Sequence, residues 1–133
     1  MSHSVPANTV IIGIGSNINP KANIGKATKL LSQLCRFVAA SKFIKTKPIG
    51  FKSQNDFLKG AILIATPLNH ARLKSALKQI ETRLGRNRQE RHYGPRTIDL
   101  DILVWNGKVV GKDFYTRNFT RQSVLELMPG LSP

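Results

Sequence analysis

The sequence has one cysteine, Cys35, and seven acidic residues among its 133. A lone cysteine cannot form a disulfide within the chain, and its place on an apolar helical stripe predicts a buried thiol in a reducing compartment. No apolar run approaches the roughly 20 residues that a membrane-spanning helix needs, and no signal-peptide pattern opens the chain. These absences argue against a disulfide-stabilised secreted protein and against a membrane protein, so we expect a cytoplasmic chain.

Basic residues, in contrast, are abundant. The chain has 21 Lys and Arg against 7 Asp and Glu, which gives a net charge of +14. A field of this sign attracts polyanions such as nucleotides, nucleic acid or an acidic membrane surface. The three histidines are scattered and form no metal-binding pattern. The length fits one domain with a real core, since a chain of about this size buries roughly two-thirds of its unfolded surface.

Because acids are scarce, a close pair of them is informative. Asp99 and Asp101 lie one residue apart in an otherwise apolar segment that predicts a strand. Side chains at i and i+2 of a strand point to one face, so the two carboxylates are expected to stand together. The residues expected on the opposite face are Ile98, Leu100, Ile102 and Val104. Carboxylates plus substrate phosphates are the usual ligands of Mg²⁺.

Five arginines run through the loop that leads into this strand: Arg83, Arg86, Arg88, Arg91 and Arg96. The guanidinium group is a fork of donors that suits phosphate oxygens. Together with the two carboxylates, these arginines predict a magnesium–polyphosphate site. Taken alone, the same arginines are also compatible with a solvated loop.

The hydrophobic pattern predicts the order strand, helix, strand, strand, helix, strand. The strands are expected at 10–14, 37–44, 57–66 and 98–105, and the helices at 20–35 and 69–85. Asn19 or Ser16 is the candidate cap of the first helix, and Asn69 and Gly85 bound the second. Asn106–Gly107 predicts a hairpin turn. Residues 46–56 form a loop long enough to be a functional lid.

This order is typical of a ferredoxin-like βαββαβ sandwich, an α+β fold with two helices on one face of an antiparallel sheet. We expect one domain over 1–133, with a loose leader at 1–8 and a hairpin and tail at 106–133. The other face of the sheet must then be covered by loops and tail, or hold a ligand. Gly13 and Gly15 lack the third glycine of a dinucleotide loop, which favours a tight strand-to-helix turn over phosphate binding.

Four motifs, in this order, carry a resemblance to a known family. They are Gly13-Ile-Gly-Ser-Asn17; Thr46…Pro48-Ile-Gly50 running into Asp56-Phe-Leu58; Ile80-Glu81…Gly85-Arg-Asn-Arg88; and Gly94-Pro-Arg-Thr-Ile-Asp-Leu-Asp-Ile-Leu103. The set resembles the 6-hydroxymethyl-7,8-dihydropterin pyrophosphokinases of the folate pathway, over residues 10 to about 131. The last motif is the most specific of the four.

The resemblance implies that the pterin hydroxymethyl oxygen attacks the β-phosphorus of ATP and that AMP leaves. It implies two Mg²⁺ ions held by Asp99 and Asp101. The residues implied to close on or assist the phosphates are Arg86, Arg88, Arg96 and Arg117. The nucleotide contacts implied are Lys78, Glu81, Arg88, Tyr93, Arg96, Ile102 and Arg117. In-line transfer of this kind depends on positioning and charge neutralisation more than on covalent help.

The resemblance also implies a pterin pocket, made by Thr46, Lys47, Ile49, Phe57, Lys59 and Phe119. Phe57 and Phe119 are suited to sandwich a flat ring. Lys59 stands where the family has an asparagine, and an ammonium group can donate hydrogen bonds but cannot accept them. Phe57 as core filler and Glu81 as a helical ion-pair partner remain alternatives at these positions.

A second class of function stays open at this point. A divergent paralogue with altered or lost pterin activity could act as a basic nucleotide- or nucleic-acid-binding module. The strands are mostly aliphatic, whereas RNA-binding sheets present aromatic stacking platforms. The paired carboxylates would also repel phosphates in the absence of Mg²⁺. We therefore expect a monomer acting on two small molecules, ATP and a pterin, without a membrane partner and with nucleic acid as the less favoured alternative.

Overall fold

The structure, a computed structural model, describes residues 8–47, 55–85 and 97–131. Within them the strands are β1 (Asn8–Ser16), β2 (Arg36–Ala40), β3 (Ile44–Thr46), β4 (Phe57–Thr66), β5 (Asp99–Trp105) and β6 (Lys108–Val109). The helices are α1 (Pro20–Ser32), α2 (His70–Arg83), α3 (Asp113–Thr116) and α4 (Asn118–Leu127). The strands form one antiparallel sheet in the order β2-β4-β1-β5-β6, with β3 also paired to β4. The predicted ferredoxin-like α+β fold is confirmed.

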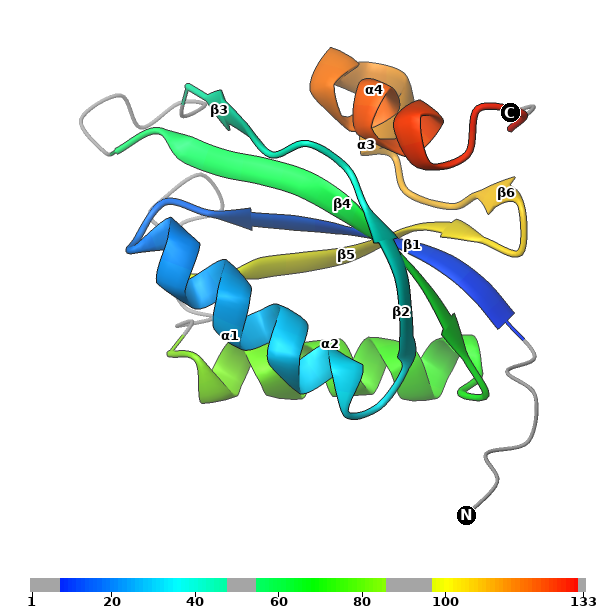
Figure 1. Cartoon of the computed structure of the whole chain (residues 1–133), viewed down its shortest axis with the longest axis horizontal. Coiled ribbons are helices and arrows are strands. Elements are labelled where there is room, and N and C mark those ends of the chain that lie inside the picture. The colour runs from blue at the N-terminus through cyan, green and yellow to red at the C-terminus, as the bar shows by residue number, and fades with distance from the viewer. Residues whose placement is uncertain (1–7, 48–54, 86–96, 132–133) are drawn as a thin grey trace.

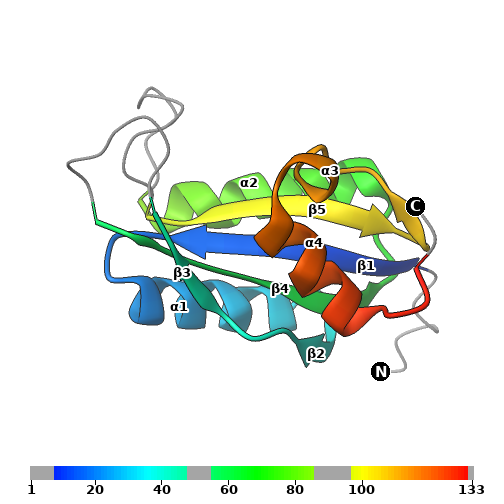
Figure 2. The ribbon, with the colours of Figure 1, turned by 90° about the horizontal axis from the view of Figure 1, so that it is seen from above.

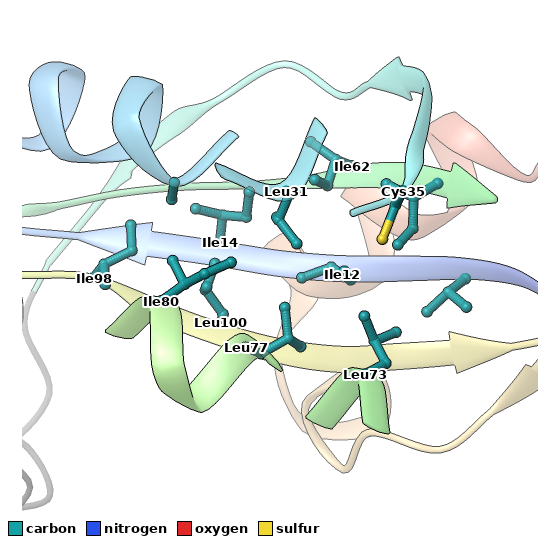
Figure 3. Close-up of a cluster of buried hydrophobic side chains, with 13 residues drawn as sticks. Ile12, Ile14, Leu31, Cys35, Ile62, Leu73, Leu77, Ile80, Ile98 and Leu100 are labelled. Carbon is teal, nitrogen blue, oxygen red and sulfur yellow. The ribbon is translucent and has the colours of Figure 1, made fainter. Parts of the chain in front are cut away.

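The two long helices, α1 and α2, lie on one face of the sheet, below it in Figure 1. The second helix begins where the sequence predicts, because Asn69 Oδ1 accepts a hydrogen bond from the Arg72 backbone N–H at 2.9 Å. It ends before Gly85, whose φ of 96° is favourable for glycine. Its apolar stripe, Leu73, Leu77 and Ile80, packs with side chains of α1 and the sheet into the main core (Figure 3).

The chain after β6 covers part of the other face. Figure 1 shows α3 and α4 above the sheet, and Figure 2, which looks onto that face, shows α4 crossing the strands. A second buried cluster lies between them: Ile11, Ala61, Leu103, Val104, Phe114 and Val124. The tail therefore covers this face as expected. The hairpin before it is also as predicted, with φ of 49° at Asn106 and 81° at Gly107.

Two predictions about the strands are wrong. The segment 37–44 is not one strand with one buried face, because pairing is interrupted between β2 and β3 and both Phe37 and Val38 are exposed. At the interruption, the Ser41 hydroxyl accepts a hydrogen bond from the Ala61 N–H at 2.9 Å. The Phe43 ring lies where a side chain on Gly60 would stand. A tertiary contact, rather than a local turn signal, thus divides this edge strand.

The second error concerns the face of Val104. The register of β5 on β1 shifts between Ile11 and Ile12, which leaves Leu103 as the extra residue of a bulge. Ile98, Leu100 and Ile102 face the helix layer as predicted, whereas Val104 belongs to the cluster under α4. Because a bulge reverses the alternation beyond it, the simple period-two prediction fails from this residue onward.

Candidate active site

Two cross-strand rows, centred on β1, gather predicted site residues on the face toward α4. Gly15 pairs with Lys59 of β4 on one side and with Asp99 of β5 on the other. Gly13 pairs in the same way with Ala61 and Asp101. Directly opposed residues of antiparallel strands point to the same face. Both carboxylates and the lysine therefore share one surface, which confirms the shared face predicted for the aspartates.

These residues border a cavity between the sheet and the tail. Its walls from the sheet include Asp99, Asp101 and Lys59, with Gly13 and Gly15 as its floor. Its walls from the tail are Asp113, Phe119, Thr120 and Ser123. The cavity measures about 40 Å³, enough for about three water molecules. Asp101 is exposed and Asp99 half-buried, so solvent-borne ligands can reach both carboxylates.

The glycines of β1 have a role that the sequence did not indicate. Gly13 lies within the strand, as its place in the predicted segment 10–14 implies, but Gly15 lies in the strand as well and not in the turn predicted after it, which is a correction. A Cβ on Gly15 would lie 3.3 Å from Cγ of Lys59, and one on Gly13 would lie 2.9 Å from Cδ1 of Leu103. The missing side chain of Gly15 lets the Lys59 stem lie over the central strand, and that of Gly13 leaves room for Leu103.

Phe57 of β4 and Phe119 of α4, the pair predicted to sandwich a flat ring, face a common point. That point is occupied by the Lys59 ammonium group, 4.8 Å from the centroid of each ring. Burial lowers the pKa of Lys59, and the nearby Arg117 lowers it further, against smaller opposite effects of the neighbouring aspartates. Arg117 itself lies 3.5 Å from Asp113, with which it forms an ion pair.

Thr46 lies beside this aromatic pair. It pairs in register with Phe57, so its side chain points to the same face. Its Oγ1 atom is buried and has no hydrogen-bond partner within residues 8–47, 55–85 and 97–131. A buried hydroxyl without a partner is costly, and a polar ligand edge between the rings would relieve that cost. Lys47, the next residue, is exposed beyond the end of β3.

Three predicted nucleotide contacts lie on the helix side of β5 instead of at the cavity. Lys78 is exposed on α2, and Ile102 is half-buried against the main core. Glu81 is only 3% exposed, and its Oε2 accepts a hydrogen bond of 2.8 Å from the backbone N–H of Leu100. Leu100 is the residue between the two aspartates. Glu81 therefore anchors the strand that carries them, and a direct contact between Glu81 and nucleotide remains a prediction.

Six predicted residues lie outside the described part of the chain: Ile49, Arg86, Arg88, Arg91, Tyr93 and Arg96. Their roles also remain predictions. The sequence reasoning in turn missed Asp113, Thr120 and Ser123 as cavity residues. Asp113 carried a usable signal, since it is one of only seven acids. The position of Ser123 depends on how α4 packs, and no local pattern indicates it.

The donor set at the cavity suits a hard cation. Mg²⁺ is usually bound through one or two carboxylates, with waters and substrate phosphates completing its shell; Asp99 and Asp101 supply that number. Among the described residues, no group of three or more His, Cys, Asp and Glu side chains could hold an ion by itself. A closed structural zinc site, which needs four protein ligands, does not fit this pair.

In the described portion, no helix has the length and apolar character to cross a bilayer.

Comparison with known proteins agrees with this geometry. A family model described as 7,8-dihydro-6-hydroxymethylpterin-pyrophosphokinase (HPPK) matches residues 11–129. The chain belongs to the HPPK family. The resemblance carried by the four sequence motifs is thereby confirmed, and the family is one of pyrophosphokinases.

Relatives of the HPPK family align over most of the chain. A 2-amino-4-hydroxy-6-hydroxymethyldihydropteridine pyrophosphokinase of Haemophilus influenzae is 37% identical over 81% of this chain and 69% of its own length. The enzyme of the same name from Bacillus subtilis is 40% identical over 74% of this chain and 60% of its own length. That of Methylorubrum extorquens is 37% identical over 89% of this chain and 77% of its own length. The chain thus spans three-fifths to three-quarters of these relatives.

Proposed function

We propose that this chain transfers pyrophosphate from ATP to the hydroxymethyl group of 6-hydroxymethyl-7,8-dihydropterin, in folate biosynthesis. ATP is the co-substrate of HPPK enzymes, and the relatives are named for this reaction. The observation that carries the proposal is that Asp99, Asp101, Lys59 and Phe119 line one cavity and that the Phe57 ring faces the same Lys59 ammonium group as Phe119. The residues proposed to bind the polyphosphate and those proposed to bind the flat ring are thus neighbours, as this transfer requires.

Asp99 and Asp101 are the residues that would hold Mg²⁺, and the proposal assigns them two ions. Bound there, magnesium neutralises the charge that the phosphates carry and polarises their oxygens. The chain itself fixes the carboxylates. Asp99 is paired to Gly15 in the centre of the sheet, and Glu81 anchors the intervening Leu100 from the other side. Such preorganised charge is the larger part of what a phosphoryl-transfer site contributes.

The acceptor is proposed to stack between Phe57 and Phe119, with a polar edge toward the buried hydroxyl of Thr46. Stacking fixes the ring plane, and the Thr46 hydroxyl fixes its rotation within that plane. Lys59 lies in the same cavity as the carboxylates, so a ring held there directs its substituent toward the phosphates. Holding the two reactants in this orientation converts a bimolecular step into a nearly unimolecular one.

The remaining proposals are those that motif positions support. Arg86, Arg88 and Arg96 donate to phosphate oxygens, with Arg117 assisting from the start of α4. Lys78, Tyr93 and Ile102 contact the nucleotide, and Lys47 and Ile49 border the pterin.

We further propose a single domain that works as a cytoplasmic monomer. Sedimentation of the purified chain tests whether it is a monomer, since a mass of twice 14.8 kDa would show a dimer and contradict the proposal.

The test is AMP release from ATP and Mg²⁺ with and without 6-hydroxymethyl-7,8-dihydropterin. Asp99→Asn keeps the side-chain size but weakens the metal site. We expect it to lower the pterin-dependent rate at least about 100-fold, since a metal ion supplies several kcal/mol of transition-state stabilisation. Glu126→Gln is the charge control, because Glu126 is exposed on α4 and accepts from the Lys42 N–H, which the amide oxygen can still do. Its rate should stay within about twofold of wild type.

Two results would contradict the proposal. If folded wild-type protein releases no pterin-dependent AMP, the assigned reaction is wrong. ATP binding that is equally tight with and without Mg²⁺ would remove the metal role of the two aspartates, whatever the reaction.

A further inference from the structure

Lys59 occupies the position that a flat substrate ring needs. Its ammonium group lies 4.8 Å from the centroids of both Phe57 and Phe119. Within the described residues, no hydrogen bond or ion pair of this ammonium group accompanies the two ring contacts, and one of the three neighbouring acids, Asp113, is paired with Arg117. The cation is therefore held mainly by the negative faces of the rings.

Stacking of a flat ring and binding of a cation use the same surface. A substrate ring packs on the faces of the two phenyl groups, and the ammonium group attracts those same faces. The cavity of about 40 Å³ that remains beside Lys59 holds a few water molecules but not a bicyclic ring. One occupant must leave before the other can bind.

The lysine has a route by which to leave. Its stem lies over Gly15, where no side chain obstructs it. On the far side of Gly15, in the same cross-strand row, lies Asp99.

Building on the proposed function, we propose that Lys59 is a specificity-determining residue of the aromatic slot, by which we mean the space between the Phe57 and Phe119 rings. It acts as a gate because its ammonium group must leave the slot before a flat ring can enter. Its ammonium group fills the space between Phe57 and Phe119 in the free protein, and the acceptor ring binds only after displacing it along the open strip over Gly15. Lys59 thus weakens binding of the flat ring. A chain with a short uncharged side chain at this position binds the ring without that competition.

The experiment measures the dissociation constant of 6-hydroxymethyl-7,8-dihydropterin by calorimetry, with Mg²⁺ and a non-hydrolysable ATP analogue present. The proteins are wild type, Lys59→Ala, Lys59→Arg and Lys45→Ala. Lys45→Ala is the charge-matched control, since Lys45 is exposed on β3, opposite Leu58 in the register and not opposite Phe57 or Lys59. Circular dichroism confirms that each variant is folded.

We expect Lys59→Ala to bind the pterin about tenfold more tightly than wild type, which corresponds to about 1.4 kcal/mol. Lys59→Arg should bind no more tightly than wild type, because a guanidinium group also stacks on aromatic faces. Lys45→Ala should differ from wild type by less than twofold. In free wild-type protein, NMR should show the Lys59 ε-methylene protons shifted upfield by the rings, and pterin should abolish this shift.

Weaker binding by Lys59→Ala would overturn the proposal, because Lys59 would then contact the substrate instead of excluding it. Equal binding would overturn it as well. If pterin-dependent AMP release is intact in either case, the proposed function stands and the gate alone fails. If no variant binds pterin or releases AMP, the proposed function fails and the gate fails with it.

Discussion

Glu81 offers the sharpest test of how the helix layer supports the site. Its buried carboxylate accepts a hydrogen bond from the N–H of Leu100, the residue between Asp99 and Asp101. Glu81→Ala removes that acceptor and leaves a buried backbone donor in β5 without it. We expect the loss to appear both in the stability of the chain and in the positioning of the two aspartates.

The magnitude follows from three contributions. A hydrogen bond to a charged group contributes about 1.5–3 kcal/mol, and the lost Cγ methylene contributes about 0.8 kcal/mol more. The alanine variant no longer has to bury a charged carboxylate, and this partly offsets the loss of stability. We therefore expect Glu81→Ala to lower the free energy of unfolding by about 2 kcal/mol. For a chain of this size that is roughly a 6–10 °C fall in Tm.

Urea denaturation followed by circular dichroism measures the stability, and AMP release measures the site. Glu81→Gln is the matched control, since its amide oxygen can still accept from the Leu100 N–H. A neutral acceptor contributes about 0.5–1.5 kcal/mol, so the glutamine variant should lose no more than about 1 kcal/mol. An alanine variant within about 0.5 kcal/mol of wild type would refute the anchoring role. Equal loss in both variants would show that the charge, rather than the acceptor, matters.

Two further predictions concern packing and thiol chemistry. Gly60→Ala should destabilise the chain by about 1–3 kcal/mol in the same urea assay, because its Cβ would lie 2.7 Å from the Phe43 ring. Gly25→Ala, which adds a Cβ in open space on α1, should instead stabilise it by about 0.5–1 kcal/mol; loss of stability in Gly25→Ala, or none in Gly60→Ala, would contradict the packing argument. Burial raises the pKa of the Cys35 thiol, and a hydrogen bond with Thr66 lowers it by a smaller amount. Iodoacetamide at pH 8 should therefore alkylate Cys35 far more slowly in the native chain than in the urea-unfolded chain. Equal rates would contradict the burial of this thiol. The same raised pKa means that Cys35 stabilises the fold fully below the unfolded pKa of the thiol, and that this contribution declines as pH rises toward the folded value.

The sequence by itself determined the features that local physics fixes. The strand at 57–66, the start of α2 at Asn69 and its end before Gly85 follow from side-chain period, a capping oxygen and a positive φ. The shared face of Asp99 and Asp101 follows from the two-residue period of a strand, and the scarcity of acids made that pair informative. The four ordered motifs identified the family, and the fold followed from the order of elements.

Only the tertiary structure decided how those pieces meet. The bulge at Leu103, which moves Val104 to the other face, and the division of 37–44 into two strands arise from pairing with distant residues. Glu81 became a strand anchor because α2 packs under β5, and Asp113 and Ser123 reached the cavity because the tail folds over the sheet. The position of Lys59 between two rings, one on β4 and one on α4, depends on contacts 60 residues apart in sequence. No local pattern specifies such a contact, because its free energy arises only when the sheet and the tail come together.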